Sequence, residues 1–209
     1  MAVLTGLAPD PRQPGYRLVE VDRGRFASLP AADLELLPLS VGREIPERVL
    51  ERLRELADLE AAWRAALRIQ RLRGHARVDL QRRLLRKQHP PTAVDGALER
   101  LTERGLLDDR AFAFHYAAIH AARGRGAPRL VRDLLAQGVE RRLAERVVQE
   151  ALAAEGLDGD GVARAVAERR ARQLAGLPPE ARRRRLLAFL ARRGFSGGKV
   201  RELVRELCG

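Results

Sequence analysis

Arginine side chains account for most of the chemistry that this sequence could perform. Lysine and arginine make up 40 of the 209 residues against 28 acidic residues, which gives a formal net charge of +12, and only Lys87 and Lys199 are lysines. A guanidinium group is planar and donates paired hydrogen bonds to carboxylates and phosphates. The composition therefore favours a partner that is a polyanion, or a protein surface associated with one.

The positive charge is distributed unevenly along the chain. Residues 1–60 carry a net charge of −3 (8 basic, 11 acidic), residues 61–160 carry +6 (19 basic, 13 acidic) and residues 161–209 carry +9 (13 basic, 4 acidic). A solvated basic face, or arginine enrichment caused by nucleotide bias in the coding sequence, is the alternative explanation. We favour a binding surface formed by residues 61–209.

The candidate binding residues lie on or beside three segments that we expect to be helices. Like residues of stacked repeats line one continuous surface, which could follow a helical groove. Four consecutive arginines at 182–185 cannot all face one side of a helix, so at least one is expected to be a bystander. The candidates for contact with a partner or with nucleic acid are Arg73, Arg82, Arg83, Arg86, Lys87, Arg125, Arg129, Arg132, Arg182, Arg183, Arg185, Arg192, Arg193 and Lys199.

No constellation of residues indicates catalysis or metal binding. Asp108 and Asp109 are better explained as capping residues at the start of a helix than as an acid–base pair. His115 and His120 are five residues apart, which does not place both on one helix face. We therefore expect no catalytic residue, no metal site and no cofactor, and we do not expect an enzyme.

An apolar pattern occurs three times along the chain. It is anchored on Leu84, Leu134 and Leu190, each preceded by a leucine four residues earlier. Counted from the fifth residue after each anchor, apolar residues recur at plus 5, 8, 9 and 12 in all three copies. Leucines four apart share one face of a helix, and the later offsets form one stripe of a second helix. The pattern predicts an internal repeat of helix, short turn and helix.

The turns between the paired helices differ among the copies. Gly138 and Gly194 stand where the end of a helix needs a left-handed residue. Gln88 occupies this position in the first copy and is followed by Pro90 and Pro91, so we expect the first turn to be built differently. Two helices cannot bury both stripes alone, so each copy is expected to use a preceding helix, over residues 61–72, 110–122 and 162–174.

The repeats define a mainly α-helical chain with three tandem three-helix repeats over residues 59–109, 110–160 and 161–209. The glycine-rich residues 156–161 predict a flexible joint before the third repeat. Alternating apolar residues on either side of a turn at residues 22–24 predict a β-hairpin within an N-terminal hairpin and helix segment, residues 16–58. Residues 1–15 are rich in proline and glycine and are expected to form a disordered tail.

The remaining signals concern the location of the protein. Cys208 is the single cysteine, so no disulfide framework is expected. The N-terminus lacks the basic start and apolar core of a signal peptide, and no apolar run approaches the roughly 18 residues of a membrane span. We expect a cytoplasmic monomer that does not associate with membranes.

Three motifs in order resemble the bacterial RecX family of regulatory proteins. The first is the run GLLDD at 105–109 followed by Phe112, the second is GRG at 124–126 before LVRDL at 130–134, and the third is GV at 138–139. The run LARRGFS at 190–196 is similar to the closing repeat of that family, and the resemblance covers roughly residues 16–209. The sequence departs from the family pattern at His75, Ala76, Asp79, Ala127 and Asp133.

The resemblance implies an elongated, curved protein of tandem three-helix repeats that lodges in the helical groove of the RecA recombinase filament on single-stranded DNA. It also implies suppression of the RecA ATPase, strand-exchange and co-protease activities, with contact to single-stranded or double-stranded DNA as a secondary property. The alternative is a general basic helical-repeat protein that binds nucleic acid and affects RecA by competing for DNA. A weaker third hypothesis is a scaffold for an unrelated partner.

Overall fold

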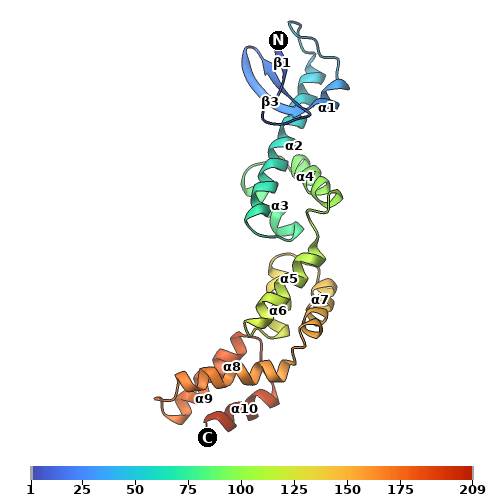
Figure 1. Ribbon diagram of the computed structural model, residues 1–209. Coiled ribbons are helices and arrows are strands. Elements are labelled where there is room, and N and C mark those ends of the chain that lie inside the picture. The colour runs from blue at the N-terminus through green and yellow to red at the C-terminus, as the bar shows by residue number, and fades with distance from the viewer. Residues whose placement is uncertain (1, 209) are drawn as a thin grey trace. The chain divides into compact units, whose positions relative to one another are not determined.

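A computed structural model describes residues 2–208, and its elements fall into two compact units. The first unit comprises Met1–Arg73 with Leu80–Leu106, and the second comprises Gly74–Asp79 with Leu107–Gly209. In chain order the elements are β1 (Leu4–Pro9), β2 (Tyr16–Val21), β3 (Gly24–Pro30), α1 (Ala31–Glu35), α2 (Glu47–Leu72), α3 (Arg77–Arg86), α4 (Pro91–Glu103), α5 (Asp109–Ala122), α6 (Ala127–Ala136), α7 (Arg141–Ala154), α8 (Gly159–Gln173), α9 (Pro179–Arg192) and α10 (Gly198–Cys208) (Figure 1). Among the described residues, none of the helices combines the length and the apolar character that a membrane span requires.

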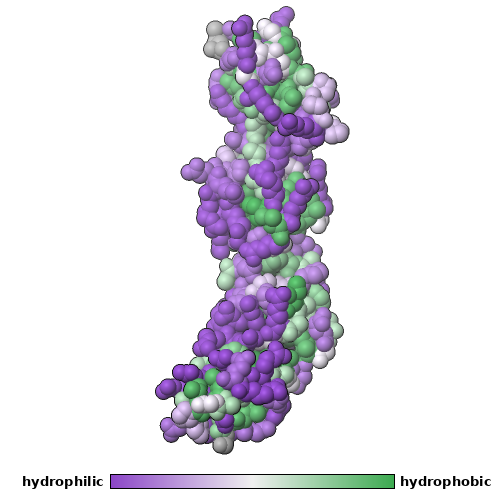
Figure 2. Space-filling view, turned by 60° about the vertical axis from the view of Figure 1, so that its left-hand side comes forward, coloured by the Kyte–Doolittle hydropathy of each residue, from purple (hydrophilic) through white to green (hydrophobic). Residues whose placement is uncertain are grey.

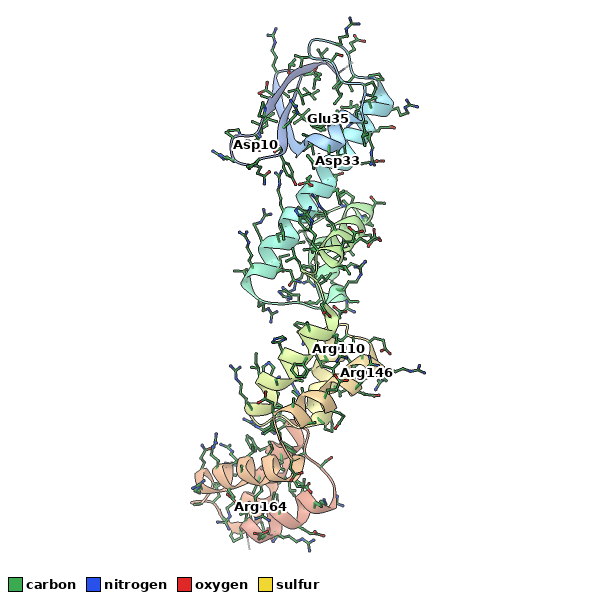
Figure 3. The ribbon with its side chains drawn as sticks, turned by 45° about the vertical axis from the view of Figure 1, so that its right-hand side comes forward. Asp10, Asp33, Glu35, Arg110, Arg146 and Arg164 are labelled. Atoms are coloured by element: carbon green, nitrogen blue, oxygen red, sulfur yellow. The ribbon has the colours of Figure 1, made fainter. Side chains whose placement is uncertain are left out.

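The three strands form one antiparallel sheet in the order β1-β2-β3. β2 and β3 form the predicted hairpin, and Asp22 and Arg23 at its tip have φ angles of 50° and 63°, as a two-residue type I′ turn requires. The prediction of a disordered tail over residues 1–15 is wrong, because this segment contains β1. Leu4 is fully buried, and Asp10, labelled in Figure 3, accepts a hydrogen bond of 2.5 Å from the hydroxyl of Ser28. These contacts order a segment whose composition indicated disorder.

Helix α2 runs without interruption for 26 residues and belongs both to the N-terminal sheet domain and to the first repeat. Val49, Leu53 and Leu56 in its first half pack with the buried side chains of the sheet, and its second half packs against α4. The segment contains no glycine or proline and is rich in strong helix formers. The predicted boundary between residues 58 and 59 therefore falls inside a helix and is wrong as a break in the chain.

A buried carboxylate joins α2 to α4. Glu60 is 3% exposed, its carboxylate pairs with the guanidinium group of Arg100, and it lies 3.8 Å from Arg64. The guanidinium group of Arg100 also lies 4.7 Å from the ring centroid of Trp63. A buried charge costs several kcal/mol unless it is paired. The pairing partners of Glu60 therefore hold these two helices in one arrangement.

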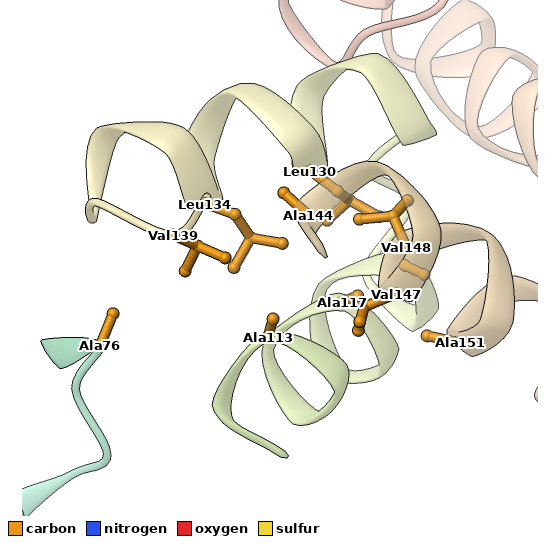
Figure 4. Close-up of a cluster of buried hydrophobic side chains, with 11 residues drawn as sticks. Ala76, Ala113, Ala117, Leu130, Leu134, Val139, Ala144, Val147, Val148 and Ala151 are labelled. Carbon is orange, nitrogen blue, oxygen red and sulfur yellow. The ribbon is translucent and has the colours of Figure 1, made fainter. Parts of the chain in front are cut away.

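The three repeats are the bundles α2–α4, α5–α7 and α8–α10, and the predicted apolar stripes form their cores. Both leucines of every middle helix are fully buried, a burial that stabilises the fold by roughly 1.5–3 kcal/mol for each side chain. In the second repeat, Leu130 and Leu134 pack with Ala113 and Ala117 of α5 and with Val147 of α7 (Figure 4). The repeat of helix, short turn and helix is confirmed, as is the use of a preceding helix by each copy.

The turn after the middle helix has the same backbone conformation in all three repeats. Gly138 and Gly194 have φ angles of 86° and 91°, and Gln88 has a φ angle of 64°. In each copy the amide of the following residue donates to the carbonyl of the anchor leucine, over 3.4, 3.1 and 3.0 Å in chain order. The expectation that the first turn is built differently is therefore wrong. Glutamine adopts the left-handed conformation there at a cost of roughly 1–2 kcal/mol.

Two conditions require glycine in the second and third turns. The φ angle is positive, and close neighbours leave no room for a Cβ atom. A Cβ atom on Gly138 would lie 2.4 Å from the Cβ of Val78, and one on Gly194 would lie 2.7 Å from the backbone nitrogen of Arg129. Val78 and Arg129 belong to the first turns of α3 and α6. The end of each of these middle helices therefore rests on the start of the middle helix one repeat earlier, whereas Gln88 is exposed and has room for its side chain.

The predicted flexible joint over residues 156–161 is replaced in part by helix. Gly159, Asp160 and Gly161 form the first turn of α8. Asp158 caps this helix, because its carboxylate accepts hydrogen bonds from the amides of Asp160 and Gly161 over 3.3 and 3.1 Å. The prediction of a joint is therefore wrong for the second half of the segment, where an N-cap organises the glycines.

We predict that Gly194→Ala destabilises the second unit more than Gly156→Ala does. Both glycines have positive φ angles, but a Cβ atom on Gly156 meets no atom within 4 Å. Gly156→Ala should lower the free energy of unfolding by roughly 1–2 kcal/mol, the cost of left-handed backbone. Gly194→Ala should lower it by about 1–3 kcal/mol more, the cost of overpacking against Arg129. Urea unfolding of both variants measures the difference, and equal losses would show that close approach at Gly194 does not matter.

Candidate partner-binding surface

The middle helices expose an arginine stripe on the side away from their buried leucines. Arg82 of α3 and Arg132 of α6 lie two residues before the anchor leucine, and Arg86 of α3 and Arg192 of α9 lie two residues after it. Positions four apart share one helix face. All four side chains are exposed, and within residues 2–208 none of them forms a side-chain hydrogen bond or an ion pair. We call these four arginines the outer stripe.

Other exposed arginines are paired with acidic residues of the same repeat. Arg110 of α5 donates to Glu150 of α7 over 2.9 Å, and Arg164 of α8 donates to both carboxylate oxygens of Glu206 of α10 over 2.8 and 2.9 Å (Figure 3). These pairs join the first and third helices of their repeats. In the space-filling view, hydrophilic side chains cover much of the visible surface (Figure 2). What marks out the outer stripe is the recurrence of its arginines at equivalent positions of different repeats, together with their lack of internal partners.

The arginines at 182–185 differ in exposure, because consecutive residues of a helix face different sides. Arg183 and Arg185 are exposed, whereas Arg182 is half-buried beside Glu168 and Leu207. The Nε atom of Arg182 is buried and has no hydrogen-bond partner within residues 2–208. Arg183 and Arg185 are thus accessible to a partner, whereas Arg182 is partly covered by its neighbours in the same repeat.

Arg125 and Arg129 are held together by one carboxylate. Asp133 accepts from Nη1 of Arg125 and from Nε of Arg129, each over 2.8 Å, and Arg125 also donates to the hydroxyl of Tyr116 over 3.0 Å. The Asp133 side chain is only 14% exposed. These two predicted binding residues therefore have a structural role in the second repeat, which orients their remaining donors.

Arg193 connects the second repeat to the third. Its Nη1 atom donates to the carbonyl of Arg123 over 2.6 Å and to the carbonyl of Gly124 over 3.1 Å, at the end of α5. The carbonyl of Arg193 in turn accepts from the amide of Gly126 over 2.8 Å. A guanidinium group that satisfies free carbonyls at a helix end is a favourable C-terminal contact. Arg193 therefore joins two repeats of the fold, in addition to any role that it has in binding a partner.

The remaining predicted residues have different surroundings. Arg73 follows the end of α2 and is exposed, as is Lys87 beyond α3. Arg83 is half-buried on α3. Lys199 is exposed but lies 2.5 Å from the carboxylate of Asp160. Binding by any of these side chains stays a prediction, and Lys199 would have to exchange an existing ion pair for a new one.

The structure brings six basic side chains together where the second and third repeats meet. They line a pocket of about 440 Å³, which we call the junction pocket. Sequence reasoning missed Arg123 and His120, which end α5, because their proximity to α9 depends on how the repeats pack. The sequence signal was the run RGRG at 123–126, in which Arg123 directly precedes a helix-ending glycine. The lining residues are His120, Arg123, Arg125, Arg129, Arg192 and Arg193.

His120 reports on the electrostatics of the junction pocket. Its ring lies 4.2 Å from that of Tyr116, and its Nδ1 atom is buried without a hydrogen-bond partner within residues 2–208. Burial lowers the pKa of His120 below its ordinary value of 6.5, and the positive charges of Arg125 and Arg123 lower it further, against a smaller opposite effect of Asp133. Burial and the two neighbouring guanidinium groups thus both disfavour the charged imidazolium form of His120.

Asp108 and Asp109 have structural roles. Asp108 caps α5 by accepting from the amides of Arg110 and Ala111 over 2.8 and 3.0 Å, and Asp109 accepts from the amide of Arg77 over 2.7 Å. The capping interpretation of this acidic pair is confirmed for Asp108, whereas Asp109 lies in the first turn of α5 and is not its N-cap. Over residues 2–208, no group of three or more histidine, cysteine, aspartate or glutamate side chains is arranged to hold a metal ion.

We predict that Arg125→Gln raises the pKa of His120. The substitution removes a nearby positive charge and frees Asp133 from one of its partners, and both effects favour the imidazolium form. NMR titration of the His120 ring resonances measures the change. The control is Arg132→Gln on the exposed face of α6, which should leave the titration midpoint of His120 unchanged. An unchanged midpoint in Arg125→Gln would show that burial alone sets the pKa of His120.

Comparison with known proteins agrees with this architecture. The family model described as "RecX, third three-helix domain" matches residues 160–204, which correspond to most of α8–α10. The chain is 40% identical over 146 residues to the regulatory protein RecX of Halorhodospira halophila, covering 69% of this chain and 87% of the relative. It is 34% identical over 151 residues to the regulatory protein RecX of Thermobifida fusca, covering 71% and 80%.

A solved structure shows that the fold is shared. The crystal structure of a regulatory protein RecX matches with a TM-score of 0.72 over 99% of this chain and 100% of that chain, at 18% sequence identity. The crystal structure of RecX from Lactobacillus salivarius matches with a TM-score of 0.56 over 72% of this chain and 96% of that chain. Taken with the identity to its relatives, the fold and the matched third domain show that this chain belongs to the RecX family of regulatory proteins.

Proposed function

We propose that this protein binds the RecA nucleoprotein filament in its helical groove and inhibits the RecA ATPase, strand-exchange and co-protease activities. Membership of the RecX family supports a regulatory role. The observation that carries the proposal is the outer stripe, whose arginines recur at equivalent positions of different repeats without internal partners. The proposal places the protein in the cytoplasm, where it acts as a monomer.

The physical basis is a match between two repeating structures. A filament presents the same acidic groups on each successive protomer, and the tandem repeats place arginines at equivalent positions of different repeats, Arg82 with Arg132 and Arg86 with Arg192. A hydrogen bond to a charged group contributes about 1.5–3 kcal/mol when it forms. Several such contacts spread over neighbouring protomers would hinder the rearrangements that accompany ATP hydrolysis and filament growth.

A second candidate is a general nucleic-acid-binding protein that acts by competing for DNA. The net charge of +12, concentrated toward the C-terminal end, favours it. Binding of this kind depends on phosphate contacts, so the logarithm of the affinity falls with the logarithm of salt concentration by about 0.7 per phosphate neutralised on single strands. Recognition of the filament's protein surface depends less on salt and requires RecA.

Titration of preformed RecA filaments on single-stranded DNA separates these two candidates. ATP hydrolysis is followed as the protein is added, and binding to bare DNA of the same length is measured in parallel. We expect inhibition at protein concentrations well below those that saturate bare DNA. Inhibition only where bare DNA is already saturated would support competition, and absence of inhibition with a cognate RecA would contradict the proposal.

We predict that the double variant Arg132→Glu with Arg192→Glu weakens inhibition by about tenfold or more, because two unpaired guanidinium groups of the outer stripe are replaced by repelling carboxylates. The half-inhibitory concentration in the ATPase assay measures the effect. The matched control is Arg201→Glu with Arg205→Glu on α10, which changes the net charge equally at exposed positions. Equal losses in both double variants would mean that net charge, and not the outer stripe, determines inhibition.

A further inference from the structure

A second hollow lies beside the junction pocket, and the two share Arg123 and Arg193. It has a volume of about 320 Å³, at the lower end of the roughly 300–1,000 Å³ of ligand pockets. Its lining combines the end of α5 with one face of α8, so it lies where the second repeat meets the third. We call it the apolar hollow after its aliphatic side chains, which are Ala121, Ala122, Leu157, Val162, Ala165 and Val166.

The charged side chains that line the two hollows are all basic, and the carboxylate of Asp133, which lines neither hollow, pairs with Arg125 and Arg129 of the junction pocket. Arg123, Arg169, Arg170 and Arg193 border the apolar hollow, and no carboxylate lines either hollow among the described residues. Two other hollows of the same unit differ, since one contains Asp160, Glu202 and Glu206 among its lining residues and the other contains Glu168. An aliphatic floor with an uncompensated arginine border is complementary to a ligand that joins an apolar group to an acidic one.

The lining favours a protein ligand over a nucleobase. Proteins that bind single-stranded nucleic acid stack bases on exposed aromatic rings. Phe189 is the aromatic residue that lines the apolar hollow, but the guanidinium groups of Arg170 and Arg193 lie 5.3 and 4.8 Å from its ring centroid. The ring of Phe189 is therefore already in contact with two cations, and the floor offers aliphatic surface that suits an aliphatic side chain.

We propose that these two hollows bind an acidic segment of a partner protein. An aliphatic side chain of the segment occupies the apolar hollow, and a neighbouring carboxylate binds Arg123 and Arg193 at the shared border. This inference rests on the proposed function, since the partner is the protein component of the filament. It adds an anchor site between the second and third repeats to the outer stripe.

The arginines of the site are partly fixed before any ligand binds. Arg193 is held by two backbone carbonyls and by Phe189, and Arg125 and Arg129 are held by Asp133. Ordering a long side chain on binding costs about 0.5–1.5 kcal/mol, so guanidinium groups that are already oriented bind with less loss. Arg123 and Arg169 are exposed, have no side-chain partner within residues 2–208, and can adapt to the ligand.

The test places a larger side chain in the apolar hollow without changing the charge. Ala165 is exposed on α8 and lines the hollow, so Ala165→Leu should fold normally and occupy part of the space. Ala61→Leu, at an exposed position inside α2, is the matched control. Binding of each full-length variant is measured to RecA filaments formed on labelled oligo(dT), and separately to bare oligo(dT). Circular dichroism and thermal melting establish that each variant is folded.

We expect Ala165→Leu to raise the Kd for the filament by about tenfold or more, as blocking an anchor site does, and to leave the Kd for bare oligo(dT) unchanged. Ala61→Leu should change neither value. The double variant Arg123→Gln with Arg169→Gln should weaken filament binding more than Arg201→Gln with Arg205→Gln, which removes the same charge on α10.

Each contrary outcome has a distinct meaning. Wild-type filament binding that persists unchanged in both Ala165→Leu and the Arg123 and Arg169 double variant would overturn the anchor site and leave the proposed function standing. An equal loss of affinity for filament and for bare oligo(dT) would assign the hollows to nucleic acid and overturn a protein ligand. Failure of the wild-type protein to bind the filament would overturn the proposed function, and the inference would fall with it.

Discussion

The burial of one pair of leucines, four residues apart on each middle helix, is the constraint on which the rest of the structure depends. Two short helices cannot exclude water from such a pair, so each repeat needs a third helix to close its core. The cores are made largely of leucine, valine and alanine, and the alanines of α5 let neighbouring helices approach closely. Small cores leave each repeat dependent on its neighbours, which is why the helix ends at Gly138 and Gly194 make contact with the preceding repeat.

Helical periodicity allowed most of the fold to be predicted. The apolar offsets repeat without gaps, and the predicted core positions of the three copies are largely buried. The N-terminal segment could not be predicted in the same way, because β1 is ordered by long-range contacts of Leu4 and Asp10 that leave no local pattern. Composition alone indicated disorder there. The prediction of a different turn at Gln88 was wrong for a related reason. A residue other than glycine can adopt the left-handed backbone conformation where nothing crowds its side chain.

The candidate site could be predicted as a region but not residue by residue. Charge counts identify which repeats are basic, yet they do not show which arginines the fold itself uses. Arg125, Arg129 and Arg193 form contacts within or between repeats, whereas the outer stripe forms none within the described residues. His120 and Arg123 could not be predicted as site residues, because only the packing of two repeats brings them beside α9. Some arginines thus hold the fold together, and tertiary structure separates them from those that we propose for recognition.

The exposed side chain of Gln88 makes it harder to add a further repeat before the first repeat than after the third. A repeat inserted before the first would rest the start of its own middle helix on Gln88, whose Cβ would fill the space that Gly138 and Gly194 leave empty. Lengthening by gene duplication at that side therefore requires a substitution to glycine as well. A duplicate of the third repeat carries its own glycine at the position of Gly194. A module added after the third repeat therefore meets no such obstacle, whereas one added before the first repeat meets the side chain of Gln88.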